Sequence, residues 1–506
     1  MILSKSATIS EMDSYLESEL GISTVTLMGR AGEAVANAVI STVPKGSSVL
    51  ILAGKGNNGG DGYAAATLLA DEYSVSVIDV FSLGQRSDAG KHYLALARER
   101  ASILPLDFSE PIIKAISDSD CIIDAIFGTG LSGEYPSEVK RLSSHVRSSS
   151  AYKISIDVPL GISADLGTVC TDVVYEQNLT VALSFIKPGL ASYPAKKYVG
   201  KLIFDNLNLP FDKILSKFIF SDYLIDYDLA RLLMPKRDDN SNKGSFGKLL
   251  MCCGSVEYLG APRLALETAL RSGVGLVGFV GERAVVDSLL PYLPEAIYST
   301  ADDSSLAECI LKLAPLHSAI LIGSGSGRRE CILETVRALF STHGSPVILD
   351  ADALNLISES GETVNFLASS NRPLVLTPHP LEMARLIGCD VAHVQSNRIS
   401  VAKDLAKAAH ATVVLKGAAT IVTDGKEIYI NSSGSSALSK AGSGDVLAAL
   451  IAALIASGVA PVRASALAVW LHGAAADSLA LELSQLGVTP SDLPKEIARQ
   501  IRKLEK

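Results

Sequence analysis

Two glycine-rich segments that contain carboxylates are the features of the sequence most able to perform chemistry. Residues 54–62 read GKGNNGGDG, follow a short apolar run and precede a helix-length segment. Residues 441–445 read AGSGD and stand directly before an apolar helix-length segment. Backbone N–H groups at a helix start bind anions, and a carboxylate beside them can take or give a proton. The sequence therefore predicts two separate ligand sites.

The first segment leaves three interpretations open. Residues 54–59 match G-x-G-x-x-G, and Asp79 ends the next predicted strand, which is the pattern of a dinucleotide-dependent dehydrogenase. Asp61 opposes this, because a carboxylate at a helix start repels a pyrophosphate. A plain strand-to-helix turn with Asp61 as N-cap is the second interpretation. The third interpretation is a loop spanning 55–62 that binds a ligand other than a dinucleotide pyrophosphate. Five consecutive polar or glycine residues favour it.

Carboxylates also follow two later predicted strands in the same half. Asp124 opens DAIFGTGLSGE, and Asp157 lies in SIDVPLGI, directly before Val158 and Pro159. A buried carboxylate without a partner costs several kcal/mol, so a bound cation or polar ligand would explain both residues. For Asp124 alone, a structural cap on the following loop is an equal alternative.

The second segment has the composition of a phosphoryl-transfer site. Its amides can surround developing negative charge, while Asp445 accepts the proton of the attacked hydroxyl. The alternative is an ordinary turn followed by an acidic helix start. Since the chain has no Walker A loop, phosphate binding is expected from residues 416–420 (KGAAT) or 323–327 (GSGSG). Lys416 could equally be a solvated charge.

Both halves of the chain alternate short apolar runs with helix-length segments. This pattern predicts an α/β fold with two doubly wound domains, whose polar groups collect at the carboxyl ends of parallel strands. A length of 506 residues fits about two to four domains. The polar stretch 234–245 interrupts the alternation, so we expect the domain boundary there or just before it.

Composition narrows the possible partners and the location. The formal net charge is −9 and no long basic run occurs, so nucleic acid is not expected as a partner. The acidic N-terminus resembles neither a signal nor a transit peptide, which predicts a cytoplasmic protein. No apolar run reaches the about 18 residues of a membrane span, and residues 446–456 are predicted to be a buried helix. We interpret the seven cysteines as reduced core residues, because their spacing does not match that of zinc ligands.

The N-terminal motifs, residues 53–62, 124–134 and 155–162, together resemble the bifunctional NAD(P)H-hydrate repair enzymes. In this family an epimerase domain is fused to an ADP-dependent dehydratase domain. The resemblance covers nearly the whole chain. It implies a Rossmann-like epimerase domain at 1–222 and a ribokinase-like dehydratase domain at 223–506.

For the epimerase domain, the resemblance implies a hydrated NADH or NADPH substrate, with Asp157 as the acid/base residue. The implied substrate contacts are Asn57, Asn58, Gly59, Gly60, Asp61, Gly128, Thr129, Gly130, Leu131, Ser132, Gly133, Glu134 and Asp157. The hydrated carbon carries a hydroxyl and the ring nitrogen, so one carboxylate could move the protons that open and reclose the ring. Asn58 and Asp124 are implied to hold potassium.

Two residues depart from the family pattern in this domain. Leu160 replaces a serine associated with the potassium ion, and can contribute only through its backbone. Gly29 stands where a larger polar residue is expected. These departures leave open a nucleotide-binding regulator with an inactive N-terminal domain.

The C-terminal motifs resemble the dehydratase half of the family. This resemblance implies that ADP phosphorylates the substrate hydroxyl, which leaves AMP. Phosphate is then expelled, and NADH or NADPH is formed. These motifs are residues 243–250, 348–355, 376–386, 416–420 and 442–445. Asp445 is implied to be catalytic. The implied substrate contacts are Ala261, Gly325, His379 and Asp445, and the implied nucleotide contacts are Lys416, Gly417, Ala418, Ala419, Thr420 and Gly444.

Several assignments in this half keep an alternative. Magnesium is expected with the nucleotide, and Asp350, Asp352 and Asn355 either face it or form a structural network at a strand end. His379, between two prolines, is a ligand contact or part of a rigid turn, and His472 is expected in the core. A ribokinase-like small-molecule kinase is the rival enzyme. The resemblance also implies a homo-oligomer.

Overall fold

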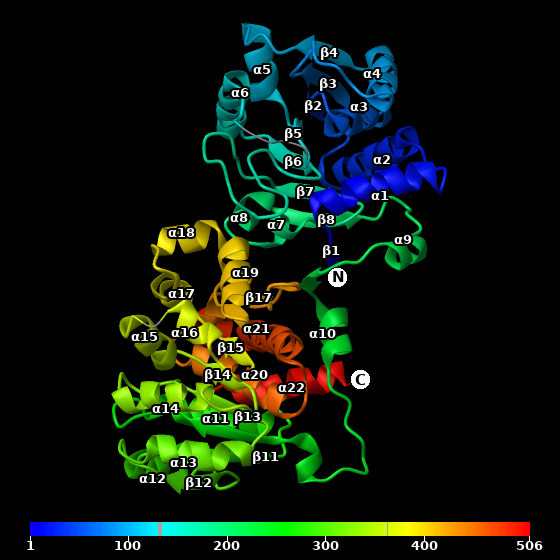
Figure 1. The fold of residues 1–506 in the computed structure, drawn as a ribbon. Coiled ribbons are helices and arrows are strands. Elements are labelled where there is room, and N and C mark those ends of the chain that lie inside the picture. The colour runs from blue at the N-terminus through cyan, green and yellow to red at the C-terminus, as the bar shows by residue number, and fades with distance from the viewer. Residues whose placement is uncertain (130–133, 362, 506) are drawn as a thin grey trace. The chain divides into compact units, whose positions relative to one another are not determined.

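The computed structural model describes residues 1–129, 134–361 and 363–505, which form two compact units (Figure 1). One unit is Ile2–Phe220, and the other is Ser221–Lys506 together with Met1. Each contains a largely parallel sheet covered by helices, so the predicted α/β class is confirmed for both.

The N-terminal unit is built on a seven-stranded parallel sheet of order β4-β3-β2-β5-β6-β7-β8. Its strands are β2 (Ser48–Ala53), β3 (Ser74–Asp79), β4 (Ser102–Pro105), β5 (Cys121–Ala125), β6 (Tyr152–Ile156), β7 (Leu179–Leu183) and β8 (Lys201–Asp205), and a short strand β1 (Ile2–Leu3) precedes them. The strand order reverses beside β2. Parallel sheets bind ligands at such a switch point, beyond the carboxyl ends of the strands.

Alternate side chains of β2 enter two different cores, which shows that both faces of this sheet are covered. Val49 and Ile51 belong to a core shared with α1, α2 and α3, whereas Leu50 and Leu52 belong to a core shared with α5 and α6. The helices are α1 (Ser6–Ser18), α2 (Thr24–Thr42), α3 (Asn57–Leu69), α4 (Asp88–Arg100), α5 (Glu110–Asp118), α6 (Ser137–Ser148), α7 (Pro188–Ala191), α8 (Lys196–Val199) and α9 (Phe211–Lys217).

The C-terminal unit has a larger sheet, in the order β9-β18-β17-β16-β15-β14-β13-β10-β11-β12. Only the pairings of β17 with β16 and with β18 are antiparallel among those described. The strands are β9 (Asp222–Ile225), β10 (Lys248–Cys252), β11 (Leu276–Gly281), β12 (Ile297–Thr300), β13 (Ala319–Ile322), β14 (Val347–Leu349), β15 (Leu374–Leu376), β16 (Ala411–Leu415), β17 (Ile421–Thr423) and β18 (Ile428–Asn431).

Helices cover this second sheet as well, and the long apolar helices near the end of the chain form most of its core. The helices are α10 (Tyr227–Leu233), α11 (Gly260–Arg271), α12 (Arg283–Leu289), α13 (Leu306–Leu313), α14 (Glu330–Phe340), α15 (Asp352–Glu359), α16 (Val364–Ala368), α17 (Pro380–Ile387), α18 (Val391–Ser396), α19 (Arg398–Ala408), α20 (Ser443–Ala456), α21 (Pro461–Gly487) and α22 (Leu493–Leu504). Short 3-10 turns occur at Lys243–Phe246, Ala314–Leu316 and Ser436–Leu438.

The polar stretch 234–245 lies inside the C-terminal unit, after its first strand and helix. Strand β9 precedes the stretch and pairs in parallel with β18, from Asp222 opposite Ile428 to Ile225 opposite Asn431. This pairing joins the segment before the stretch to the C-terminal sheet. The stretch is therefore a connection within the C-terminal unit, and the two units divide before it, between Phe220 and Ser221.

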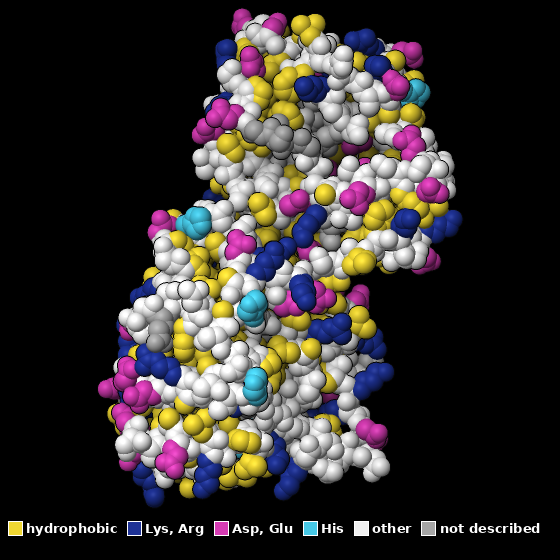
Figure 2. All heavy atoms as spheres, viewed as in Figure 1, with side chains coloured by type: hydrophobic (Ala, Val, Ile, Leu, Met, Phe, Trp, Pro, Cys, Tyr) yellow, Lys and Arg dark blue, Asp and Glu magenta, His cyan; other side chains and the backbone are white. Residues whose placement is uncertain are grey.

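Two apolar helices bear on the membrane prediction. Residues 446–456 are buried within α20, as predicted. Helix α21 is, by length and composition, apolar enough to cross a membrane, which the sequence inspection did not anticipate. However, 72% of its most apolar window is buried inside the protein, as in a core helix of a globular domain. On the face shown in Figure 2, Lys and Arg side chains are scattered among Asp and Glu.

Candidate functional site

The start of α3 corrects the predicted loop over residues 55–62. Helix α3 begins at Asn57 with Gly56 as its N-cap, so the NNGGD run forms the first helical turns and Asp61 is not an N-cap. Close packing explains this. A Cβ on Gly59 would lie 2.0 Å from the carbonyl oxygen of Gly54, and glycine alone lets the helix begin so close to the strand end.

A cavity of about 580 Å³ opens beside this helix start, at the carboxyl ends of the strands. The predicted site residues that line it are Asn57, Asn58, Asp61, Gly128, Thr129 and Asp157. Gly59 and Gly60 lie in the same helical turns, and Gly60 packs against Met28. Glu134 is exposed. The predicted contacts Gly130, Leu131, Ser132 and Gly133 lie outside the described residues.

Asp157 holds a strained position at the end of β6. Its backbone is left-handed, with φ of +64°, which is unusual for a residue other than glycine. The Asp157 Oδ1 atom accepts a hydrogen bond of 3.1 Å from the Leu183 amide and forms an ion pair with Lys187, which is 1% exposed. Lys187 was not predicted, although it follows a buried strand directly before a proline. The pair fixes the carboxylate at the cavity wall.

Two more carboxylates share the cavity with Asp157. Burial is the main cause that raises the pKa of Asp61 well above its usual range, and the negative charges of Asp157 and Asp13 add to it. Asp13, on α1, also lines the cavity, and burial raises its pKa to about 6 although Lys187 opposes the shift. The cavity therefore holds two carboxyl groups whose pKa values are raised, Asp61 and Asp13, beside the ion-paired Asp157.

Of the two residues expected to hold potassium, Asn58 lines this cavity and Asp124 is buried outside its lining. Asp124 is 1% exposed and accepts hydrogen bonds from the amides of Leu160 (2.9 Å) and Ile126 (3.3 Å). Burial raises the pKa of Asp124 to about 6, against the effect of these two amides. Asn58 donates to the Phe127 carbonyl at 2.9 Å, while its Oδ1 is buried without a partner among the described residues.

This donor set fits a cation with oxygen ligands, because an unpartnered buried amide oxygen is costly unless something binds it. The Leu160 side chain is 1% exposed in the apolar core, so only the backbone of this residue has polar atoms to offer. In the described parts of the chain, no group of three or more His, Cys, Asp or Glu side chains could hold a metal.

The remaining N-terminal observations concern Gly29 and Asp79. A Cβ on Gly29 would lie 2.4 Å from the Tyr93 hydroxyl, so Tyr93 fills the place that a larger residue at 29 would take. Asp79 is 4% exposed and forms an ion pair with the buried Arg86. A ribose hydroxyl would have to compete with Arg86 for this carboxylate, which weighs against a dinucleotide-dependent dehydrogenase.

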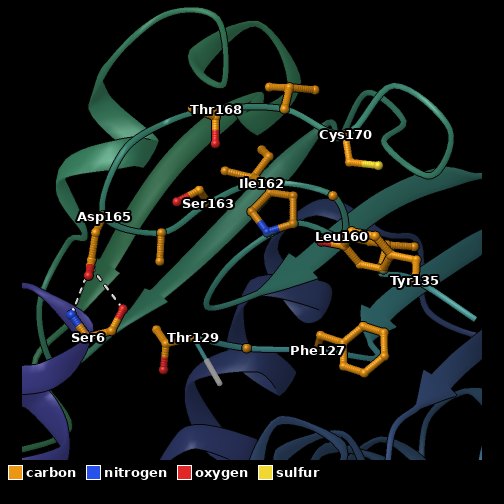
Figure 3. Close-up of a pocket in the computed structure, with 15 residues that line it drawn as sticks. Ser6, Phe127, Thr129, Tyr135, Leu160, Ile162, Ser163, Asp165, Thr168 and Cys170 are labelled. Atoms are coloured by element: carbon orange, nitrogen blue, oxygen red, sulfur yellow. Dashed lines mark hydrogen bonds between the residues drawn. The ribbon is translucent and has the colours of Figure 1, made fainter. Parts of the chain in front are cut away.

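A second cavity, of about 430 Å³, adjoins the first (Figure 3). The two share Phe127, Gly128 and Thr129. On one side of the second cavity, Asp165 accepts hydrogen bonds from the amide (2.8 Å) and hydroxyl (2.9 Å) of Ser6, where α1 begins. The two cavities together give an extended ligand more room than either alone.

In the C-terminal unit, Lys416 and Asp350 form the centre of the second site. Lys416 Nζ lies 3.0 Å from Asp350 Oδ1, which also accepts from the Thr377 hydroxyl at 2.6 Å. The other carboxylate oxygen of Asp350 accepts from the Ser324 hydroxyl at 2.9 Å. Burial lowers the pKa of Lys416, but the nearby carboxylates, Asp350 first, outweigh it and hold the pKa above its ordinary value. Lys416 is therefore not a solvated surface charge.

Asp445 and the glycine-rich helix start face the same lysine. Asp445 is the third residue of α20, and Gly442 precedes the helix with φ of +98°. Lys416 Nζ lies only 3.5 Å from the position that a Cβ on Gly444 would occupy. Burial and the neighbouring Asp350 raise the pKa of Asp445 to about 7, although Lys416 opposes the shift. An ammonium group, helix amides and a carboxylate that titrates near neutrality therefore meet here.

His379 is the N-cap of α17, and Glu382 completes its capping box. His379 Nδ1 accepts from the amides of Leu381 (3.1 Å) and Glu382 (3.2 Å), so the neutral ring carries its proton on Nε2. Burial raises the pKa of Glu382 to about 7, and its Oε2 lies 3.8 Å from Lys416 Nζ. The turn around His379 is thus rigid, and the imidazole remains 45% exposed.

The other predicted substrate contacts, Ala261 and Gly325, lie together. A Cβ on Gly325 would stand 2.5 Å from the Cβ of Ala261, and the φ of Gly325 is +62°. His472 is buried with Nε2 3.2 Å from the Ser443 hydroxyl, and burial lowers its pKa to about 4. It supports the helix start from inside, as a core residue.

The candidates for magnesium make contacts within the protein. Asp350 has the partners given above, Asp352 accepts from the Gly327 amide at 2.9 Å, and Asn355 accepts from Arg385 at 2.7 Å. These contacts favour the structural network over direct ligands. Asp352 still faces the loop 323–327.

The predicted nucleotide loop, Lys416 to Thr420, follows β16 and rests on a buried arginine. Gly417 and Ala418 are exposed, and Ala419 has φ of +51°. Arg398, 2% exposed, donates to the carbonyls of Leu415 (3.2 Å) and Lys416 (3.3 Å). Sequence analysis did not find Arg398.

The fold and these two sites define a protein of two α/β domains, with a cavity lined by carboxylates in the first and a lysine–carboxylate cluster at a glycine-rich helix start in the second. Two family models match. One, described as NAD(P)H-hydrate dehydratase, covers residues 249–499, and the other, described as YjeF-related protein N-terminus, covers residues 24–189.

Curated relatives match over nearly the full length. The chain is 33% identical to the bifunctional NAD(P)H-hydrate repair enzyme Nnr of Coxiella burnetii, over 97% of this chain and 98% of that protein. It is also 33% identical to the enzyme of the same name from Escherichia coli, over 95% and 90%. The chain belongs to the family of bifunctional NAD(P)H-hydrate repair enzymes, as its sequence motifs indicate.

Solved structures resemble the C-terminal unit. An ADP/ATP-dependent NAD(P)H-hydrate dehydratase from Bacillus subtilis, co-crystallised with ATP/Mg²⁺, is 31% identical with a TM-score of 0.50, covering 55% of this chain and 97% of that one. A ribokinase-like superfamily protein from Enterococcus faecalis is 23% identical with a TM-score of 0.51, covering 56% and 96%. The latter supports the fold alone, and the ribokinase-like prediction is confirmed.

Proposed function

We propose that the chain repairs hydrated NADH and NADPH in two steps. Its domain 1–222 interconverts the R and S epimers, and its domain 223–506 dehydrates the S epimer with ADP, giving AMP, phosphate and NADH or NADPH. The observation that carries the proposal is the occurrence of two separate proton-transfer sites in one chain. Asp157 pairs with Lys187 in one, and Asp445 lies beside Lys416 in the other.

In the epimerase domain, Asp157 is proposed as the base that takes the hydroxyl proton from the hydrated carbon. Its ion pair with Lys187 holds the carboxylate in place beside a positive charge. Asn57, Asn58 and Asp61 then orient the ring, and the adjoining cavity in Figure 3 gives room for the rest of the dinucleotide. Gly128 and Thr129 line both cavities, so they would contact the ligand where it passes from one to the other.

Potassium is proposed to bind at Asn58 Oδ1 and Asp124, with Leu160 contributing at most its backbone. A cation there would neutralise the buried carboxylate and support the cavity floor. The Leu160 replacement is then tolerated, because the serine hydroxyl is not the only oxygen available. Replacing potassium by choline should slow epimerisation and leave dehydration with ADP unchanged.

In the dehydratase domain, Asp445 is proposed to accept the proton of the substrate hydroxyl as the terminal phosphoryl group is transferred to its oxygen. Lys416 and the amides of the α20 start stabilise the negative charge that develops. The lone pair of the ring nitrogen then expels phosphate. Ala261, Gly325 and the Nε2–H of His379 are proposed to contact the substrate.

ADP is proposed to lie against Lys416 to Thr420 and Gly444, with Arg398 fixing the loop from below. Magnesium would neutralise the phosphates. Direct protein ligands for it are not expected from Asp350 or Asn355, since their oxygens are engaged within the protein. A homo-oligomer remains a prediction of the family resemblance, and a cytoplasmic location remains a prediction from the N-terminal sequence.

Two variants of the full chain test whether each domain catalyses one of the two steps. In a mixture of both epimers with ADP, Asp157→Asn should restore the S form and then stop. Asp445→Asn should restore nothing, yet still equilibrate the epimers. Accumulation of a phosphorylated product by the unaltered enzyme would favour the rival small-molecule kinase. Binding of ADP without turnover of either epimer would favour the nucleotide-binding regulator.

A further inference from the structure

Asp13 enters the epimerase cavity from a helix that has no predicted role. On α1, the flanking residues Met12 and Leu16 are fully buried in the core, which fixes the rotation of the helix. Asp13 then lines the same cavity as Asp61 and Asp157. These three carboxylates come from three different elements of the fold, and all of them border the space that the substrate would occupy.

The start of α1 is tied to the rim of the adjoining cavity. Ser6, the first residue of the helix, donates through both its amide (2.8 Å) and its hydroxyl (2.9 Å) to Asp165 Oδ1 (Figure 3). A single carboxylate oxygen thus holds the helix start against the loop that follows β6. With this anchor and the buried side chains, Asp13 has a defined position relative to Asp157.

Charged side chains surround Asp13 in the cavity. Asp157 is paired with Lys187, burial raises the pKa of Asp61 well above its usual range, and Lys55 also lines the cavity. Burial, with Lys187 opposing and Asp157 reinforcing the shift, raises the pKa of Asp13 to about 6. A group that titrates near the working pH both gives and takes a proton readily.

We propose that Asp13 is a second catalytic acid–base residue of the epimerase, acting on the ring nitrogen while Asp157 acts on the hydroxyl. The inference rests on the proposed epimerase function. In the opening step the hydroxyl proton passes to Asp157 and its O–H electron pair forms the carbonyl bond. The carbon–nitrogen bond breaks with its electron pair left on nitrogen, and the nitrogen takes the proton from the Asp13 carboxyl.

The ring then recloses by the reverse transfers. Rotation of the free aldehyde presents its other face, nitrogen attacks that carbon, Asp13 recovers its proton and Asp157 returns one to the oxygen. The sum is an isomerisation, which needs no oxidant, reductant or further reactant. Each direction uses one carboxyl group on the hydroxyl and one on the nitrogen, and Asp157 and Asp13 line the same cavity.

The test uses the full-length enzyme with the R epimer of hydrated NADPH and without nucleotide, so that the dehydratase does not consume the product. The R and S forms are separated by chromatography over time, after subtraction of the spontaneous rate. The variants are Asp13→Asn and, as a matched control on the same helix, Glu11→Gln, because Glu11 is not among the residues that line the cavity. Dehydration of the S epimer with ADP is measured in parallel.

Asp13→Asn should lower kcat/KM for epimerisation by about 100-fold or more, while Glu11→Gln stays within about twofold of the unaltered enzyme. Because Asp13 must be protonated to act on nitrogen, kcat/KM of the unaltered enzyme should fall above about pH 6, and Asp13→Asn should lack this alkaline decline. Should Asp13→Asn fail to fold, Asp13→Glu must keep both activity within about tenfold and the alkaline decline.

Three results would overturn the inference. An Asp13→Asn variant within about threefold of the unaltered enzyme would show that the carboxyl is dispensable. A slow variant with an unchanged pH profile would show that Asp13 only positions the helix. An unaltered enzyme that does not accelerate epimerisation at all would remove the proposed function and this inference together.

Discussion

Lys416 Nζ lies 3.0 Å from Asp350 Oδ1, and this ion pair joins the ends of β14 and β16 in the C-terminal sheet. Hydrogen bonds from Thr377 and Ser324 to the same carboxylate add the ends of β15 and β13. Asp350 therefore acts as the point to which four strand ends are tied. The ammonium group of Lys416 is directed by it toward the start of α20.

Asp445 should set the pH dependence of dehydration. Burial and Asp350 raise its pKa to about 7, and as a base it must be ionised. The rate of dehydration with ADP should rise with pH and level off above about pH 7, and Asp445→Asn should lower it by about 100-fold or more. Initial rates from pH 5.5 to 8.5 test this, and a rate independent of pH would contradict it. Epimerisation by the same variant should be unchanged.

Glu382 should make the C-terminal domain less stable as pH rises. Its pKa is raised from 4.5 to about 7 in the folded state, so between these values the folded protein retains a proton that the unfolded chain has lost. Stability therefore falls with pH across this window. From pH 4.5 to pH 8, Glu382→Gln should gain about 3 kcal/mol of unfolding free energy relative to the unaltered protein.

Denaturant titrations followed by the fluorescence of Trp470 measure this effect. Trp470 is the single tryptophan of the chain and is 8% exposed in the C-terminal core, so it reports the unfolding of that domain. Parallel pH curves for the variant and the unaltered protein would show that Glu382 keeps an ordinary pKa.

Arg398 should affect nucleotide binding more than the chemical step. It donates to the carbonyls of Leu415 and Lys416 beneath the nucleotide loop, so Arg398→Met should release the loop and raise KM for ADP by about tenfold or more. Arg398→Lys should recover part of this affinity. Arg372 is the matched control, because it is also buried and donates to the Leu339 carbonyl away from the loop.

Steady-state kinetics with varied ADP separate the two arginines. Arg372→Met should lose stability while keeping the KM of the unaltered enzyme. Equal effects of Arg398→Met and Arg372→Met on KM would mean that the loop does not depend on Arg398.

Gly29 and Tyr93 should show coupled effects on stability. A Cβ at position 29 would stand 2.4 Å from the Tyr93 hydroxyl, so Gly29→Ala should destabilise the N-terminal domain by about 1–2 kcal/mol. Tyr93→Phe removes the obstructing oxygen, and the double variant should regain most of the loss. Thermal unfolding followed by circular dichroism tests this in a double-mutant cycle, and additive effects would contradict it.

The order of elements and the strand-end carboxylates could be predicted from sequence. Alternating apolar runs indicate parallel strands between helices, and Asp157 and Asp445 stand out because they follow such runs or precede helices. The start of α3 could not be predicted, because Asn and Gly disfavour helices, and only the close approach of Gly54 and Gly59 explains the helical turn there.

The residues that contact or support the main residues of each site were not predicted from the sequence, for a different reason. Asp13 and Arg398 lie in helices, and the sequence does not show that one borders the cavity and that the other is buried beneath a loop. Lys187 follows a strand, but nothing local connects it to Asp157, 30 residues earlier. Glu382 could have been found, because an acidic residue three positions after His379 is the pattern of a capping box.

The central claim is that one chain both epimerises and dehydrates hydrated NADH and NADPH. The most direct test starts from an equal mixture of both epimers of hydrated NADH in potassium and magnesium, and follows the return of reduced-nicotinamide absorbance with ADP, with ATP or without nucleotide. With ADP, recovery should be complete and faster than spontaneous epimerisation allows, and it should be absent without nucleotide. Recovery that stops at half would contradict the epimerase, and no recovery with either nucleotide would contradict the whole account.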